Sequence, residues 1–293
     1  MTIILRRFNM KFINNNSFVI IIGSNKSGKS FITKDLLYHH SNSLSNYQTY
    51  YQTNSLSGIA ISKKDIDYIP PIFIYETIDK KLIKKFIKNL NKNVDCESFI
   101  ILDSYSKYLD KLFDPVNNLH KICNPSQPSN IQLSNIRPLN IQSRLSCLVV
   151  LELDYIDNIF DYGQDLKKKS PKKNINLKKS LEYLFILKEN LYANRKKIYD
   201  NFLINLGFEI EFTLFCKLLD DYTEDYNFIV IYLKSESKNI CDKIFWYRSD
   251  KHDNLKICSD EAWNYNQENL IIEPNNKTDF NTKIYDRNIN FNI

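Results

Sequence analysis

The most informative segment of the sequence is Phe18-Val19-Ile20-Ile21-Ile22-Gly23-Ser24-Asn25-Lys26-Ser27-Gly28-Lys29-Ser30. It begins with a short continuous apolar run, which is typical of a buried parallel strand. The run leads directly into Gly-x-x-x-x-Gly-Lys-Ser, and the apolar positions of residues 31–38 then have helical spacing. Strand, glycine loop and helix in this order are the context that a P-loop requires.

The chemistry of this pattern explains its residue types. Glycines let successive backbone N–H groups turn toward phosphate oxygens, and the helix N-terminus adds its own amides and positive dipole end. Lys29 is expected to reach the β- and γ-phosphates, and the Ser30 hydroxyl to hold Mg²⁺. The alternative is a glycine turn with a surface lysine. The residues predicted to bind the nucleotide, expected to be ATP, are Gly23, Ser24, Asn25, Lys26, Ser27, Gly28, Lys29, Ser30 and Phe31.

Length and composition limit the number of domains and the general class of the protein. The chain has 293 residues, of which 43% are hydrophobic and 25% charged, so one large α/β domain or two small ones are possible. The spacing of the six cysteines suits neither a zinc site nor a disulfide framework. No apolar run is long enough to cross a bilayer and no secretory signal opens the chain, so an intracellular, unsecreted protein is expected.

Further apolar runs predict the remainder of a sheet. They alternate with helical stretches, which indicates βαβ units and an α/β fold with a mainly parallel central sheet flanked by helices. The predicted strands are 71–75, 98–103, 147–152, 181–187 and 228–233, with a helix over 80–92 and a polar loop over 41–58.

One P-loop domain is expected over residues 1–265. Irregular loops are predicted at about 121–135, which is rich in Pro, Asn and Ser, and at 164–180, which is rich in lysine. Residues 266–293 read as a polar C-terminal tail.

Hydrolysis of a nucleotide would need more than the P-loop. An acidic residue at the end of a neighbouring strand orders Mg²⁺, and Asp103 is the candidate, the alternative being a helix cap. A polar residue must position water and an arginine must stabilise charge. Glu152, Arg137 and Arg144 are the candidates, although for each of them, taken singly, a surface or structural role is favoured.

The chain resembles the DNA-packaging ATPases of large nucleocytoplasmic DNA viruses, a branch of the FtsK/HerA P-loop superfamily. The residues that carry the resemblance are spread over most of 17–265. They are Ile20–Ser30, Asp35–Tyr38, Asp103, Arg137 with Asn140-Ile141, Leu181–Asn190, Asn194–Tyr199, Ile244–Arg248 and Trp263.

The resemblance implies a RecA-like sheet in a homo-oligomeric ring, a hexamer or pentamer, that translocates double-stranded DNA into a capsid during virion assembly. It implies a place in the viral factory of the host cytoplasm and in the virion, beside an unidentified capsid or portal component. By the same resemblance Gly23, Lys29 and Ser30 bind nucleotide and Mg²⁺. Asp103 is the Walker B carboxylate, Glu152 stands nearest the family's glutamine, and Arg137 acts on a neighbouring subunit's nucleotide.

Departures from the family pattern keep alternatives open. Ser104 stands where the family has a second acidic residue, and serine cannot act as the general base. Lys178 and Lys179 lie where an arginine is expected. One alternative is therefore a paralogue that binds ATP, hydrolyses it poorly and has a structural role. A small-molecule P-loop kinase is a further alternative, although no lid of clustered arginines follows the core.

The sequence indicates little about which residues would contact DNA. The net charge of +6 permits but does not require a polyanionic partner. A phosphate-binding role of the lysine run is set against a solvated loop, which is favoured. Core or interface packing is likewise favoured over base stacking for the aromatic residues Tyr222, Tyr226, Trp246 and Tyr247.

Overall fold

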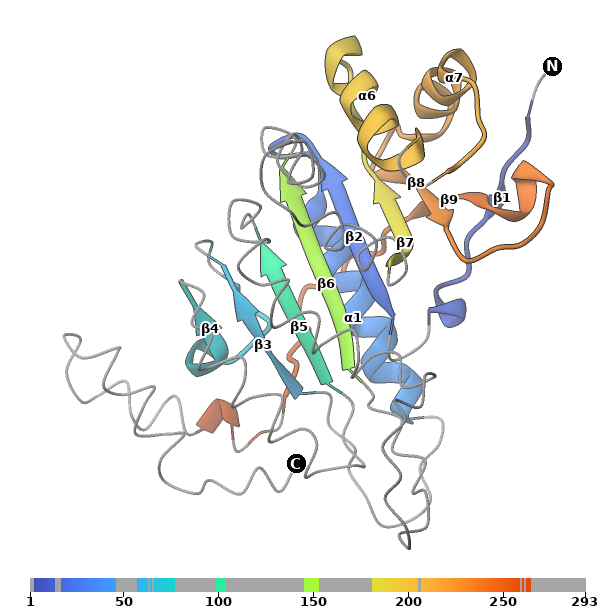
Figure 1. The fold of residues 1–293 in the computed structure, drawn as a ribbon. Helices are drawn as coiled ribbons and strands as arrows, with labels where there is room; N and C mark the ends of the chain where they lie inside the picture. The colour runs from blue at the N-terminus through green and yellow to red at the C-terminus, as the bar shows by residue number, and fades with distance from the viewer. Residues whose placement is uncertain are drawn as a thin grey trace, which may run out of the picture.

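The computed structural model describes residues 3–13, 17–45, 57–62, 64, 66–76, 98–103, 145–152, 181–204, 207–258, 260 and 262–264. These residues build one mixed sheet with the strand order β1-β9-β8-β7-β2-β6-β5-β3-β4 (Figure 1). The strands are β1 (Arg6–Arg7), β2 (Phe18–Gly23), β3 (Ser57–Ile61), β4 (Ile74–Tyr75), β5 (Ser98–Asp103), β6 (Leu145–Glu152), β7 (Leu181–Ile186), β8 (Asn227–Tyr232) and β9 (Ile244–Arg248).

The sheet is parallel around the P-loop strand. β2 pairs in parallel with β6 on one side and with β7 on the other, and β5 continues the parallel order to β3 and β4. β8 pairs antiparallel with both β7 and β9. The prediction of an α/β fold with a mainly parallel sheet is therefore confirmed.

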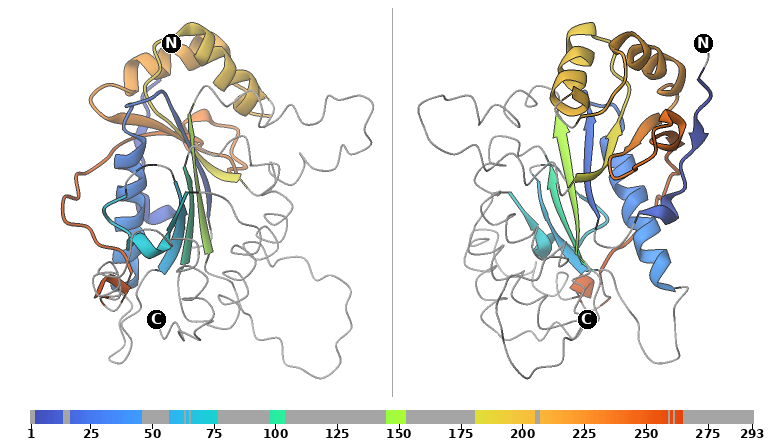
Figure 2. Two further views of the ribbon diagram at one scale, coloured as in Figure 1. Left: turned by 90° about the vertical axis from the view of Figure 1, so that its left-hand side faces the viewer. Right: turned by 45° about the vertical axis from the view of Figure 1, so that its right-hand side comes forward.

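Helices cover both faces of the sheet, and the alternation along β2 explains how. Val19 and Ile21 point to the face that holds α1 (Lys29–Ser45), whereas Ile20 and Ile22 point to the opposite apolar cluster. That second cluster includes side chains from the helices α6 (Tyr192–Ile198) and α7 (Phe212–Tyr222) and from the π-helical turn η6 (Tyr199–Ile204). Figure 2 shows α1 along one face and the pair α6 and α7 near the end of β7.

The predicted loop over 41–58 is wrong at both ends. α1 continues to Ser45, because an established helix adds residues at little cost even where the apolar pattern has ended. At the other end, Ser57 and Gly58 belong to β3. A Cβ on Gly58 would lie 2.3 Å from the backbone oxygen of Phe99 on β5, so the glycine that breaks the local strand signal permits close packing between strands.

Two further strand predictions need correction. Residues 71–73 form a 3₁₀ turn, η2 (Pro71–Phe73), because the proline before it and the one that begins it fix their φ angles, and only β4 joins the sheet. The segment 228–233 is a strand, as predicted, but it runs antiparallel. The predicted helix over 80–92, the loops at 121–135 and 164–180 and the tail from 266 lie outside the described residues.

A buried carboxylate on α1 fastens the C-terminal segment to the sheet. The Asp35 side chain is fully buried, and one of its oxygens lies 2.7 Å from Nε2 of His252 and 3.5 Å from Nε2 of His39. The Tyr38 ring stacks on His252 with centroids 3.8 Å apart. Further along, the backbone N–H of Ile257 donates to the Tyr68 carbonyl at 2.8 Å.

His40, next to this cluster, makes folding sensitive to pH. Its side chain is buried, and burial first and the charge of His39 second lower its pKa from 6.5 to about 4. Below pH 6.5 the unfolded chain therefore binds a proton that the folded chain excludes. The stability associated with neutral His40 is complete above pH 6.5 and is lost as the pH falls toward 4.

We expect His40→Gln to lose less stability between pH 7 and pH 4 than the wild type, by up to about 3 kcal/mol. Urea unfolding of both proteins across this range measures the difference. Parallel pH profiles would show that His40 does not titrate as its burial requires.

Candidate nucleotide site

The glycine loop joins β2 to α1 through two left-handed residues. Lys26 has φ 60° and Gly28 has φ 104°, and a side chain at the second position would be strained. The N–H groups of Phe31 and Ile32 donate to the Gly28 carbonyl at 3.0 and 3.2 Å, which begins the helix within the loop. A Cβ on Gly23 would lie 2.3 Å from the Ser27 hydroxyl, so the loop folds back tightly over the end of β2.

Lys29 lies inside this loop. Its side chain donates from Nζ to the carbonyl oxygens of Gly23 at 2.9 Å and Ser24 at 2.6 Å, and the residue is only 5% exposed. A buried ammonium is stable where such acceptors compensate the loss of water. The loop thus holds a positive charge among backbone amides at the end of a strand, which is the requirement for an anion site.

Asp103 lies at the same edge of the sheet. It ends β5, which is separated from β2 by β6 alone, so the usual strand spacing puts it about 10 Å from the P-loop strand. Its carboxylate accepts from the Ser62 hydroxyl at 3.4 Å and pairs with Lys64 at 3.5 Å. Burial, and secondarily the Asp103 charge, raises the pKa of Tyr68 nearby.

Glu152 occupies the position between these two groups. Along β6 it pairs in register with Gly23, while Val150 pairs with Asp103. The backbone therefore brings three predicted residues, Lys29, Asp103 and Glu152, to one carboxyl edge. Ser104, Arg137 and Arg144 lie outside the described residues, as do the lysine run and Lys178 and Lys179.

The donor set fits a nucleotide with Mg²⁺. A Mg²⁺ in a P-loop site takes one hydroxyl and one carboxylate from the protein and completes its shell with water and phosphate. Ser30 is the second residue of α1, next to Lys29, and could offer the hydroxyl, and Asp103 could offer the carboxylate. Accordingly, no all-protein metal cage is needed, and within the described ranges no three His, Cys, Asp or Glu side chains form one.

The end of β7 forms the other wall of the loop. The N–H of Leu187 donates to the Ile22 carbonyl at 2.9 Å, and the Leu187 side chain lies within contact distance of a Cβ position on Gly23 and on Gly28. The next residue, Lys188, reaches both carboxylate oxygens of Glu224, at 2.7 and 2.6 Å.

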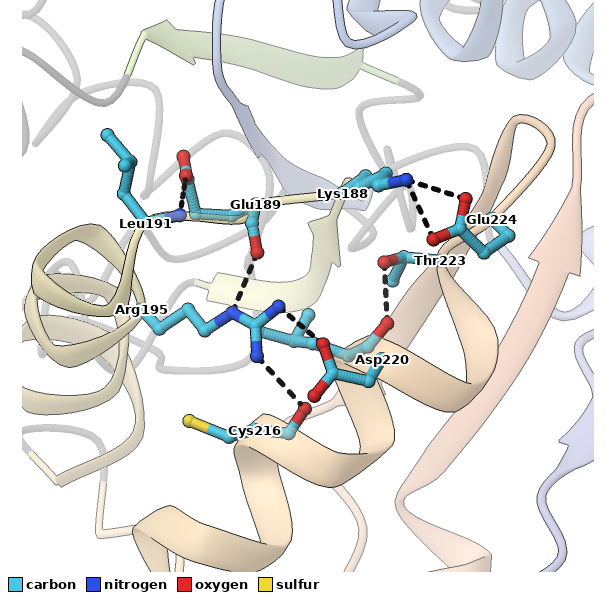
Figure 3. A network of polar contacts seen from close by, with 9 residues as sticks. Lys188, Glu189, Leu191, Arg195, Cys216, Asp220, Thr223 and Glu224 are labelled. Atoms are coloured by element: carbon cyan, nitrogen blue, oxygen red, sulfur yellow. Dashed lines mark hydrogen bonds and ion pairs between the residues drawn. The ribbon is translucent and has the colours of Figure 1, made fainter.

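A polar network then fixes the chain beyond Lys188 (Figure 3). The Arg195 guanidinium donates to the Glu189 carbonyl at 2.7 Å and to the Asp220 carboxylate at 2.5 Å, and the latter bond raises its pKa. The Glu189 carboxylate, 4% exposed, accepts from the N–H of Leu191 at 2.8 Å. The segments Leu181–Asn190 and Asn194–Tyr199 are among those that carry the family resemblance, and this network shows that part of them ties α6 and α7 to the strand beside the P-loop.

The aromatic residues divide into two groups. Core packing is confirmed for Tyr247, 4% exposed, and Tyr222 is held by its hydroxyl, which accepts from the N–H of Leu5 at 2.9 Å. Tyr226 does not lie in the core, because it is 63% exposed and lies against the glycine loop, 3.3 Å from a Cβ position on Gly28. Core packing is therefore wrong for this residue, whereas interface packing stays a prediction. This tyrosine stands in a turn whose two left-handed central residues are Asp225 and Tyr226, and the absence of a glycine at either position left this turn without its usual sequence signal.

Comparisons with known proteins point to viruses. No protein-family model matches the chain. Its sequence is 23% identical over 80% of its length to protein 088R of Invertebrate iridescent virus 3, and 22% identical over 79% to protein L437 of Acanthamoeba polyphaga mimivirus, both described as uncharacterized. The matched segments cover 76% of protein 088R and 72% of protein L437. The resemblance to proteins of large DNA viruses is thereby confirmed.

Similar solved structures include two P-loop proteins. One is the genome packaging NTPase B204 of Sulfolobus turreted icosahedral virus 2 in complex with AMPPCP, with 11% identity and a TM-score of 0.47 over 82% of this chain and 100% of that one. Another is the conjugation coupling protein TcpA from pCW3, with 9% identity and a TM-score of 0.42 over 88% of this chain and 66% of that one. Among the helices that the structure describes, none has the length and apolar character of a membrane span.

We expect Arg195→Ala to lower the free energy of unfolding by about 1–2 kcal/mol, because it removes charged hydrogen bonds whose partner Asp220 is itself partly exposed. Urea unfolding measures the change. Lys196→Ala is the matched control, since it deletes an exposed pair with Asp200 on the same helix and should have little effect. Equal losses in the two variants would contradict a bracing role for Arg195.

Proposed function

We propose that the chain is an ATP-binding P-loop ATPase of the genome-packaging type, which couples ATP hydrolysis to translocation of double-stranded DNA into a capsid. The observation that carries the proposal is the buried Lys29 ammonium in a glycine loop, one strand removed from the strand that ends in Asp103. The family-like stretches and the viral relatives support the packaging role.

The residues of the loop would bind the triphosphate. Lys29 exchanges two neutral carbonyl acceptors for the charged oxygens of the β- and γ-phosphates, which make stronger hydrogen bonds. The loop amides and the first turn of α1 hold the remaining oxygens. Ser30 and Asp103 would hold Mg²⁺, which neutralises charge on the phosphates when it is bound.

Lys64 is a second partner for the Asp103 carboxylate and would compete with Mg²⁺ for it. It pairs with Asp103 at 3.5 Å, and its side chain is 43% exposed. An ion pair with a half-exposed lysine is weak, so a divalent cation can take over the carboxylate. Glu152, the register neighbour of Gly23, is proposed to position the attacking water, and Arg137 to stabilise charge on a neighbouring subunit's nucleotide.

The partners follow from the same proposal. A homo-oligomeric ring, a hexamer or pentamer, would enclose double-stranded DNA and act beside a capsid or portal component. Assembly would take place in the viral factory of the host cytoplasm, with the protein carried into the virion.

A specific residue favours a second candidate function. Ser104 follows Asp103 directly and cannot take a proton from water as a carboxylate does. The second candidate is therefore a paralogue that binds ATP, turns it over poorly and serves a structural role in virion assembly.

The motor proposal predicts ATP turnover that rises with linear double-stranded DNA. Lys29→Ala should reduce turnover at least a hundredfold, because it removes the charge that stabilises the transferring phosphoryl group. Phosphate release with and without DNA measures both effects. Lys34→Ala is the control, since it deletes a positive charge from the same helix outside the glycine loop, where it pairs with exposed Asp67. Turnover that DNA leaves unchanged would contradict a motor.

The second candidate makes the opposite prediction. The wild type should bind ATP tightly with negligible turnover, and Ser104→Glu should raise turnover, since it supplies a carboxylate beside Asp103. Single-turnover hydrolysis measures the gain, with Ser104→Ala as the control. Fast hydrolysis by the wild type would reject this candidate.

A further inference from the structure

Two large aromatic side chains stand exposed beside the glycine loop. Phe31 follows Ser30 in the first turn of α1 and is 44% exposed, and Tyr226 precedes β8 and is 63% exposed. Their ring centroids lie 5.6 Å apart with an interplanar angle of 47°. We call these residues the aromatic pair. Residues far apart in the sequence thus build one exposed aromatic surface beside the glycine loop.

The backbone that carries Tyr226 is strained. Asp225 has φ 51° and Tyr226 has φ 61°, and the N–H of Asn227 closes the turn on the Glu224 carbonyl at 2.9 Å. A turn with two left-handed central residues favours asparagine and glycine. A bulky ring in this conformation is an outlier, and such outliers cluster at ligand sites.

The turn is held in place from both sides. At its first corner Glu224 pairs with Lys188, which follows the Leu187 that packs against the loop glycines. On the α7 side, the Thr223 hydroxyl and N–H both donate to the Leu219 carbonyl, at 2.6 and 3.1 Å. The Tyr226 ring therefore keeps a fixed place next to Gly28.

The ligand chemistry that fits has two parts. The loop and Lys29 attract phosphate, while exposed aromatic faces next to them attract a planar, weakly polar group by stacking. A nucleotide combines these parts within one molecule. We propose that the aromatic pair is the base subsite of the nucleotide site, where Tyr226 and Phe31 stack on the purine of the bound triphosphate; this inference rests on the nucleotide binding proposed above.

The subsite accounts for the unfavourable turn residue. Asparagine at position 226 would suit the backbone better but would offer no ring. Stacking on the aromatic pair should recognise the presence of a base.

The test separates base from phosphate. Calorimetric titration of the full chain with MgATP and with magnesium tripolyphosphate, which has no base, gives two affinities for each variant. Tyr226→Asn should weaken MgATP binding roughly tenfold and leave tripolyphosphate binding unchanged. Its thermal midpoint should equal or exceed that of the wild type, because asparagine relieves the strain. Phe31→Leu, which keeps an apolar helix former, should weaken MgATP alone in the same way.

Tyr192→Ala is the matched control. Tyr192 is 69% exposed on α6, where it packs on Phe212 rather than on the loop, so both affinities should stay as in the wild type. Lys29→Ala should weaken both ligands.

Two results would overturn the base subsite and leave nucleotide binding intact. One is unchanged MgATP affinity in Tyr226→Asn while Lys29→Ala still loses both ligands. Another is unchanged MgATP affinity together with weaker DNA binding, which would assign the ring to nucleic acid. A wild type that binds neither ligand would overturn the nucleotide proposal itself.

Discussion

The structure around the glycine loop depends on one buried charge. The Lys29 ammonium is 5% exposed and bonds to the carbonyls of Gly23 and Ser24. Taking an ammonium out of water is costly unless acceptors surround it, so the loop must curl to present those carbonyls. That curl requires a glycine at the end of β2, because any Cβ there meets the Ser27 hydroxyl.

Most of the parallel half of the fold could be predicted from the sequence. β2, β5 and β7 are buried on both faces, and such strands appear as continuous apolar runs whatever their neighbours. The ends of these apolar runs also predicted that Lys29 and Asp103 lie at the same edge of the sheet, because each residue stands at or just after the carboxyl end of a parallel strand. The antiparallel pairings of β8 and the strand β9 depend on long-range register, which no local pattern encodes.

The missed features of the candidate site share a physical cause. The strand β3 was not predicted because Gly58 weakens its local strand pattern. A glycine suits this position because a Cβ there would meet the backbone oxygen of Phe99 on β5, which lies some forty residues away in the sequence. Tyr226 looked like a core residue because it adjoins an apolar strand, yet its left-handed conformation turns the ring out of the sheet and over Gly28. The structural roles of Lys188 and Arg195 could not be predicted, because they depend on partners that are distant in the sequence, Glu224 in the turn after α7 and Asp220 on α7.

The interactions of Lys188 and Arg195 differ in strength, and the stronger one determines the position of the turn at residues 224–227. The Lys188–Glu224 pair is short, but its side chains are 40% and 62% exposed, and an exposed ion pair contributes about 0–1 kcal/mol. Arg195 is 13% exposed and bonds to backbone carbonyls on two elements, which holds α7 to the end of β7 more firmly. α7 in turn ends at Tyr222, where Thr223 closes its last turn immediately before Glu224. The position of the Tyr226 ring thus depends mainly on α7 and on the Arg195 guanidinium that holds it. The exposed Lys188–Glu224 ion pair contributes less.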